Sequence, residues 1–113
     1  MIRVEAVVIR DRVETVIDAV AREAEHVGVT VVDAVGQGFQ HDTSHELPKA
    51  LLTFIVPEHK AKKIAEAICG AARSGNEYGD GLVWLSPVYH IKHVRTGTPL
   101  HEHVETRVGT GVA

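Results

Sequence analysis

The chain has 113 residues, which is enough for one domain with one hydrophobic core and too few for two. Apolar residues make up 44% and charged residues 24%, and 12 Lys and Arg against 15 Asp and Glu give no basic surplus of the kind that nucleic-acid binding requires. No apolar run approaches the roughly 18 residues of a membrane span, and no secretion signal is recognisable. The single cysteine, Cys69, is expected to be a small core residue of a cytoplasmic protein.

The first part of the chain contains two strand patterns with a helix pattern between them. Residues 2–9 alternate apolar and other side chains, which predicts a strand with one apolar face. From Val13 onward the apolar residues recur at helical spacing, and Gly28 is expected to end this helix. Residues 29–35 are β-branched and strand-like until Gly36-Gln37-Gly38 interrupts them.

The second part repeats the alternation. A strand is predicted at residues 50–56, which follow Leu47-Pro48-Lys49 and end at Pro57. Residues 58–72 have the apolar spacing of a helix. A short apolar strand at 82–85 follows, and the alternating residues 88–95 are a further strand candidate.

This order predicts an α+β chain with the ferredoxin-like βαββαβ fold, in which two helices cover one face of an antiparallel sheet. The strands at 29–35 and 50–56 are apolar at nearly every position, so both of their faces need cover. A homo-oligomer that packs sheet against sheet would provide it. The tail from Thr98 has no sustained period and is expected to be an extra strand or disordered.

Three glycines, Gly75, Gly79 and Gly81, lie between the second helix and the strand at 82–85. Glycine permits a turn whose backbone N–H groups point toward an approaching ligand, and Asp80 lies within that turn. Spacing alone favours a plain surface turn, since glycines are common in any hairpin.

A longer set of residues resembles a known family. Residues 71–75 (Ala-Ala-Arg-Ser-Gly), 79–81 (Gly-Asp-Gly), 86–88 (Ser-Pro-Val) and 93–97 (His-Val-Arg-Thr-Gly) are similar to the carboxy-terminal signature of the PII-type signal-transduction proteins. The resemblance covers residues 1–97, which form the expected domain, and leaves 98–113 as a tail. It implies a cytoplasmic homotrimer that regulates a partner and is not an enzyme. Any association with the membrane would be peripheral and through that partner.

The resemblance also implies a nucleotide site between subunits, with Gly79-Asp80-Gly81 as the B-loop and residues 36–40 as the base of the T-loop. The residues implied for nucleotide binding are Val7, Thr30, Gly36, Gln37, Gly38, Gln40, Ile55, Gly79, Asp80, Gly81, Leu82, His93 and Arg95. Gln40 and Lys49 are implied to hold a small effector anion such as bicarbonate. From the residues alone, Gln40 could equally be a solvated loop residue and Lys49 a charge that blunts a sheet edge.

Several positions depart from the family pattern. Leu82 and Phe39 stand where family members have a phosphate-binding cation, and His93 replaces the first of two arginines, leaving Arg95. Each lost charge-assisted hydrogen bond costs about 1.5–3 kcal/mol, so ADP or AMP is expected to bind in preference to ATP. No cofactor is expected.

The T-loop is shortened and lacks the tyrosine that is uridylylated in some members, so that modification is not expected. Short loops occur in relatives that sense adenylates or bicarbonate beside carbon-handling or transport systems. We therefore expect nucleotide binding to order loop 38–47 and to control an unidentified transporter or metabolic enzyme.

The sequence contains eight histidines, which suggest an alternative to nucleotide binding. In this alternative the protein is a metal-binding trimer similar to the CutA-like proteins. His41 and His45, in one short loop, are its candidate ligands. No metal site is expected in the main hypothesis, and no arrangement of nucleophile, acid and base indicates catalysis.

Overall fold

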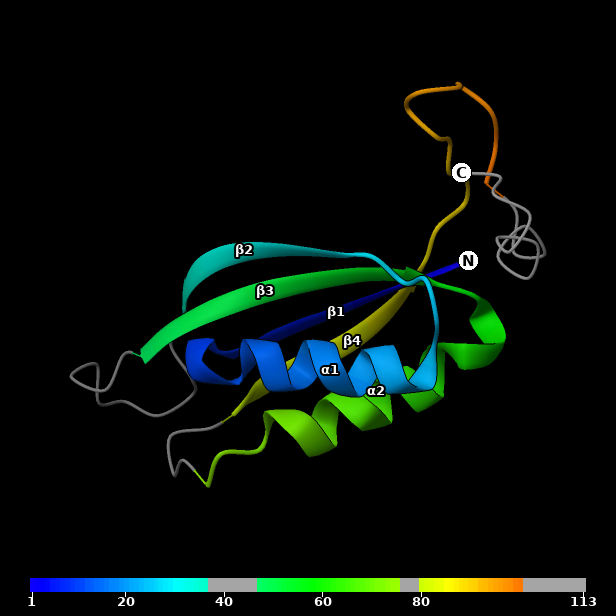
Figure 1. The fold of residues 1–113 in the computed structure, drawn as a ribbon. Helices are drawn as coiled ribbons and strands as arrows, with labels where there is room; N and C mark the ends of the chain where they lie inside the picture. The colour runs from blue at the N-terminus through cyan, green and yellow to red at the C-terminus, as the bar shows by residue number, and fades with distance from the viewer. Residues whose placement is uncertain (37–46, 76–79, 101–113) are drawn as a thin grey trace.

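A computed structural model describes residues 1–36, 47–75 and 80–100. Its elements alternate in the expected order (Figure 1). They are the strand β1 (Ile2–Ile9), the short 3-10 helix η1 (Arg10–Arg12), the helix α1 (Val13–Glu23), the strands β2 (Val29–Gly36) and β3 (Leu47–Val56), the helix α2 (Glu58–Ala72) and the strand β4 (Gly81–Pro87).

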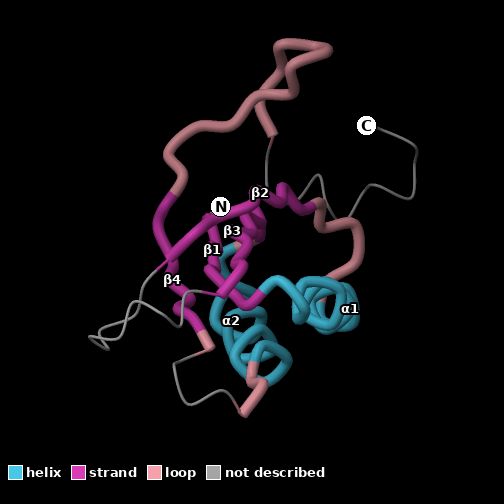
Figure 2. The backbone as a smooth tube through the Cα atoms, turned by 90° about the vertical axis from the view of Figure 1, so that its left-hand side faces the viewer, coloured by secondary structure: helices cyan, strands magenta, loops and turns pink. Residues whose placement is uncertain are grey.

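The strands form one sheet in the order β2-β3-β1-β4, and every neighbouring pair is antiparallel. β1 is central, with its Val4 opposite Phe54 of β3 and Leu85 of β4. Both helices lie on the same face of the sheet, as the end-on view shows (Figure 2). The predicted ferredoxin-like fold is therefore confirmed.

The core lies between that face and the helices. Alternation along β1 and β3 turns every second side chain toward α1 and α2, where Phe54 is 1% exposed and Val16 and Ile64 are fully buried. The apolar residues at helical spacing supply the opposite side of this core. No helix in the described part of the chain is long and apolar enough to cross a bilayer.

Arg12 joins the start of α1 to the end of α2. Its guanidinium donates through Nε and Nη2 to the carbonyl oxygen of Ala71, at 3.0 and 2.7 Å. A positive group at the carboxyl end of a helix satisfies an otherwise unpaired carbonyl and complements the helix dipole. This bond holds the end of α2, and with it the start of the segment that leads to β4.

The structure corrects three expectations. α1 ends at Glu23, before Gly28, because Ala24 turns to an extended backbone and buries its side chain in the core. Cys69 is exposed, since α2 presents Ile68 and not Cys69 to the sheet. Residues 88–95 do not form a strand: they run past the end of the sheet, where none of the described strands lies beside them to accept their hydrogen bonds (Figure 1).

Candidate functional site

Gly81 begins β4 in a position that only glycine fits. Its φ is +114°, and a Cβ atom placed on it would lie 1.8 Å from the carbonyl oxygen of Val7. Gly81 is paired with Val8 in the sheet, so β4 starts with its backbone pressed against β1. The backbone at position 81 therefore requires glycine whether or not a ligand binds nearby.

Asp80 closes the segment between α2 and β4. Its Oδ1 accepts hydrogen bonds from the backbone N–H of Ser74, at 3.1 Å, and from the Ser74 hydroxyl, at 2.5 Å. The carboxylate thus ties the two ends of residues 74–80 together. A carboxylate used in this way fixes the local backbone through hydrogen bonds from nearby donors.

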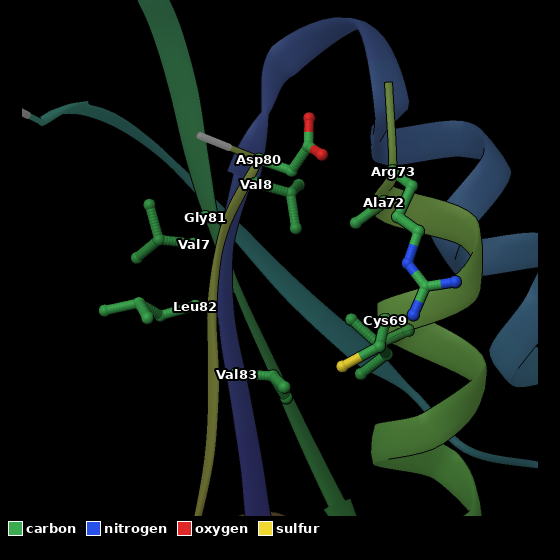
Figure 3. Close-up of a pocket in the computed structure, with 10 residues that line it drawn as sticks. Val7, Val8, Cys69, Ala72, Arg73, Asp80, Gly81, Leu82 and Val83 are labelled. Carbon is green, nitrogen blue, oxygen red and sulfur yellow. The ribbon is translucent and has the colours of Figure 1, made fainter. Parts of the chain in front are cut away.

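A hollow lies between the carboxyl end of α2 and the start of β4 (Figure 3). It has a volume of about 260 Å³, and Cys69, Arg73 and Asp80 lie at its rim. Val7 and Leu82 point away from α2, toward the opposite face of the sheet (Figure 3). The hollow is smaller than the roughly 300–1,000 Å³ of typical ligand pockets, so the described residues around it do not by themselves enclose a nucleotide there.

The face of the sheet away from the helices, the open face, carries the residues of β1 and β3 with odd numbers and those of β2 and β4 with even numbers. Val7 and Leu82 lie opposite each other on it, at the end of the sheet near Gly36. Leu82 is 68% exposed. We call Val7, Gly36, Asp80, Gly81 and Leu82 the Gly81 half-site.

Thr30 and Ile55 lie at the other end of the open face. Gly36 follows Thr30 by six positions along β2, a distance of roughly 20 Å at the rise of a β-strand. His93 and Arg95 follow β4 beyond this same end, in a segment that projects away from the sheet (Figures 1 and 2). We call Thr30, Ile55, His93 and Arg95 the Arg95 half-site.

The projecting segment closes on itself in a turn. His93 donates its N–H to the carbonyl of Thr98 at 2.9 Å and accepts at its own carbonyl from Gly97 at 2.8 Å. Lys92 and Pro99 form an isolated bridge. Val94 is 100% exposed and Tyr89 96% exposed, so these two side chains do not pack against the sheet or the helices.

Lys49 of β3 lies at the Gly81 end of the sheet. It is paired with Ile9 of β1 and with Ala34 of β2. It is partly buried and lies on the open face. The predicted anion contact of Lys49 stays a prediction. β3 is an interior strand of the sheet, so the alternative role of Lys49 in blunting a sheet edge is wrong.

Other predicted residues fall outside the described ranges. These are Gln37, Gly38, Gln40, Gly79, His41 and His45. Among the residues that the structure describes, no three His, Cys, Asp or Glu side chains gather to hold a metal ion. The metal alternative, with His41 and His45 as ligands, stays a prediction.

Sequence reasoning missed a polar network in the middle of the open face. Glu5 receives hydrogen bonds from Thr53 and Trp84 and lies beside Arg3. The alternation of Arg3 and Glu5 in residues 2–9 placed both on one strand face. Their partners could not be found without the register between strands.

Comparison with known proteins places the chain in a family. The model of the family described as Nitrogen regulatory protein P-II matches residues 1–98. The chain belongs to the P-II family. Members of this family are regulatory proteins that bind adenine nucleotides, form trimers and interact with regulatory partners.

Several curated P-II relatives match most of the chain. The "Nitrogen fixation nifHD region GlnB-like protein 1" of Methanobacterium ivanovii is 36% identical over 99 residues, which cover 82% of this chain and 92% of the relative. Its namesake in Methanococcus maripaludis is 35% identical over the same coverage. The "Nitrogen regulatory protein P-II" of Rhizobium meliloti is 30% identical over 107 residues, covering 86% of this chain and 94% of that protein. The resemblance stated from the sequence is thereby confirmed.

Proposed function

We propose that this P-II protein is a homotrimeric regulator, not an enzyme, that binds ADP or AMP in clefts between subunits. The observation that carries the proposal is the separation of the two half-sites at opposite ends of the sheet. No single chain can bring both to one mononucleotide, whereas a neighbouring copy can place its Arg95 half-site over the Gly81 half-site.

The chemistry of the cleft favours few phosphates. The Gly81 half-site offers backbone amides and the apolar Leu82, and the Arg95 half-site offers one guanidinium and the His93 ring. A triphosphate would enter with more negative charge than these groups neutralise. A small anion such as bicarbonate would bind beside Lys49, at the Gly81 end of the cleft.

The response to the nucleotide is a shift in population. Binding at the Gly81 half-site places the ligand beside Gly36 and Leu47, which are paired at the ends of β2 and β3. The loop 38–47 joins these two strands, so its conformations would be selected by the ligand and read by a transporter or a metabolic enzyme. This regulation would serve nitrogen or carbon metabolism.

Calorimetric titration with ADP, AMP, ATP and cyclic AMP tests the proposal. We expect ADP or AMP to bind with a micromolar dissociation constant and more tightly than ATP. Arg95→Ala removes a charge-assisted contact to phosphate and should weaken that binding about 10–100-fold without changing the mass of the trimer. Arg22→Ala, which removes an exposed arginine of α1 far from both half-sites, is the matched control and should bind as the unmodified protein does.

Absence of heat with all four nucleotides would contradict the proposed function. Loss of the folded trimer in Arg95→Ala would show that Arg95 has a structural role in place of the proposed contact.

A further inference from the structure

Two hydrogen bonds connect the segment after α2 to the residue before β4. Asp80 Oδ1 accepts one from the Ser74 backbone N–H at 3.1 Å and another from Ser74 Oγ at 2.5 Å. The Asp80 side chain points from the start of β4 toward the end of α2 (Figure 3). We call these two hydrogen bonds the Ser74–Asp80 clasp. It joins residues six positions apart, next to the glycine that begins β4.

Both sides of the clasp are fixed to the body of the protein. On the α2 side, Arg12 donates from Nε and Nη2 to the carbonyl oxygen of Ala71, and Ala72 is buried in the core. On the β4 side, Gly81 lies against the carbonyl oxygen of Val7, where an added Cβ would be 1.8 Å away. The clasp therefore connects two anchored points of the backbone.

The core does not depend on the clasp. Ser74 is exposed and Asp80 is half-buried, so water competes for the same donors and acceptor. The pairing of β4 with β1 runs from Gly81 to Pro87 and fixes the strand without Ser74. The main effect of the clasp is therefore local, on the backbone that enters the Gly81 half-site.

A backbone held in place before a ligand arrives favours binding. Ordering a flexible segment on binding costs conformational entropy, and a segment that is already ordered avoids that cost. Asp80 is held by Ser74, and Gly81 is held by its contact with Val7. The backbone N–H groups at the start of β4 thus keep their direction without a ligand.

We propose that Ser74 is a positioning residue for nucleotide binding. Its hydroxyl holds Asp80, and Asp80 in turn holds the backbone of the Gly81 half-site in the shape that receives phosphate. The inference rests on the proposed function and adds a residue that belongs to neither half-site. Ser74 acts without touching the ligand, and the Asp80 carboxylate acts on the backbone.

Calorimetric titration of ADP and AMP into Ser74 variants tests the inference. Ser74→Ala removes the hydroxyl and keeps the backbone N–H, so the dissociation constant should rise about 3–10-fold, the effect of one lost hydrogen bond. The urea midpoint should stay unchanged. Ser74→Thr keeps a hydroxyl and should bind as the unmodified protein does. Thr15→Ala removes an exposed hydroxyl of α1 and is the matched control, with unchanged affinity.

A double-mutant cycle tests whether Ser74 acts through Asp80. Asp80→Ala removes the acceptor together with a negative charge, and both variants that carry it share this change of charge. Adding Ser74→Ala to Asp80→Ala should therefore change the dissociation constant by less than about twofold, because the clasp is already lost.

Unchanged affinity in Ser74→Ala would overturn the inference and leave nucleotide binding, and with it the proposed function, intact. A Ser74→Thr protein that binds as weakly as Ser74→Ala would also overturn it. So would a full Ser74→Ala effect in the Asp80→Ala background, since Ser74 would then act without Asp80. Absence of binding by the unmodified protein would overturn both proposals.

Discussion

Replacing Gly81 by alanine should lower the free energy of unfolding by at least about 3 kcal/mol, because the residue combines a positive φ with a backbone contact. The added Cβ would lie 1.8 Å from the Val7 carbonyl oxygen, and that atom belongs to the central strand. Neither backbone can move without breaking the pairing of β4 with β1. Urea unfolding at fixed protein concentration measures the loss.

Gly28→Ala is the matched control for Gly81. A Cβ at Gly28 would lie in open space, so the unfolding midpoint of the Gly28→Ala variant should differ little from that of the unmodified protein. Equal midpoints for the two variants would show that β4 does not begin with the described contact. The comparison also separates the structural need for Gly81 from any role in binding, since it uses no ligand.

Phe54→Ala should cost about 3–5 kcal/mol of stability, the usual range for deleting a buried aromatic side chain. Phe54 is 1% exposed and lies opposite Val4 and Val29, so its removal leaves a cavity under three strands. Phe54→Leu keeps most of the volume and should cost less than about 1.5 kcal/mol. Unfolding at one protein concentration gives both values, and a loss near zero for alanine would place Phe54 outside the core.

Much of the fold follows from periodicity in the sequence. The helix at 58–72 was predicted with the bounds that α2 has, because Pro57 precedes it and a repeated apolar stripe runs along it. The strands were predicted within a few residues for the same reason. Residues 88–95 alternate as a strand does, yet none of the strands in the described part of the chain lies beside them to complete the pairing. Pattern alone does not reveal that a sheet has ended.

The candidate site was less accessible from the sequence. The resemblance supplied the residues of both half-sites, but only the strand register shows that Thr30 and Gly36 lie at opposite ends of one face. The role of Asp80 in holding Ser74 depends on a contact across a loop, and the polar network around Glu5 depends on pairing between residues far apart in the chain. Such contacts leave no fixed spacing to recognise.

The most direct test of the account is whether one nucleotide site needs two chains. Leu82→Glu places a repelling carboxylate in the Gly81 half-site, and Arg95→Ala removes the cation of the Arg95 half-site, so each variant alone should bind ADP or AMP poorly. In trimers assembled from equal amounts of the two, about a quarter of the clefts would pair two intact half-sites. Calorimetry should then recover binding at about that fraction, with the affinity of the unmodified protein. Confirmed mixed trimers that recover no binding would contradict a cleft shared between subunits.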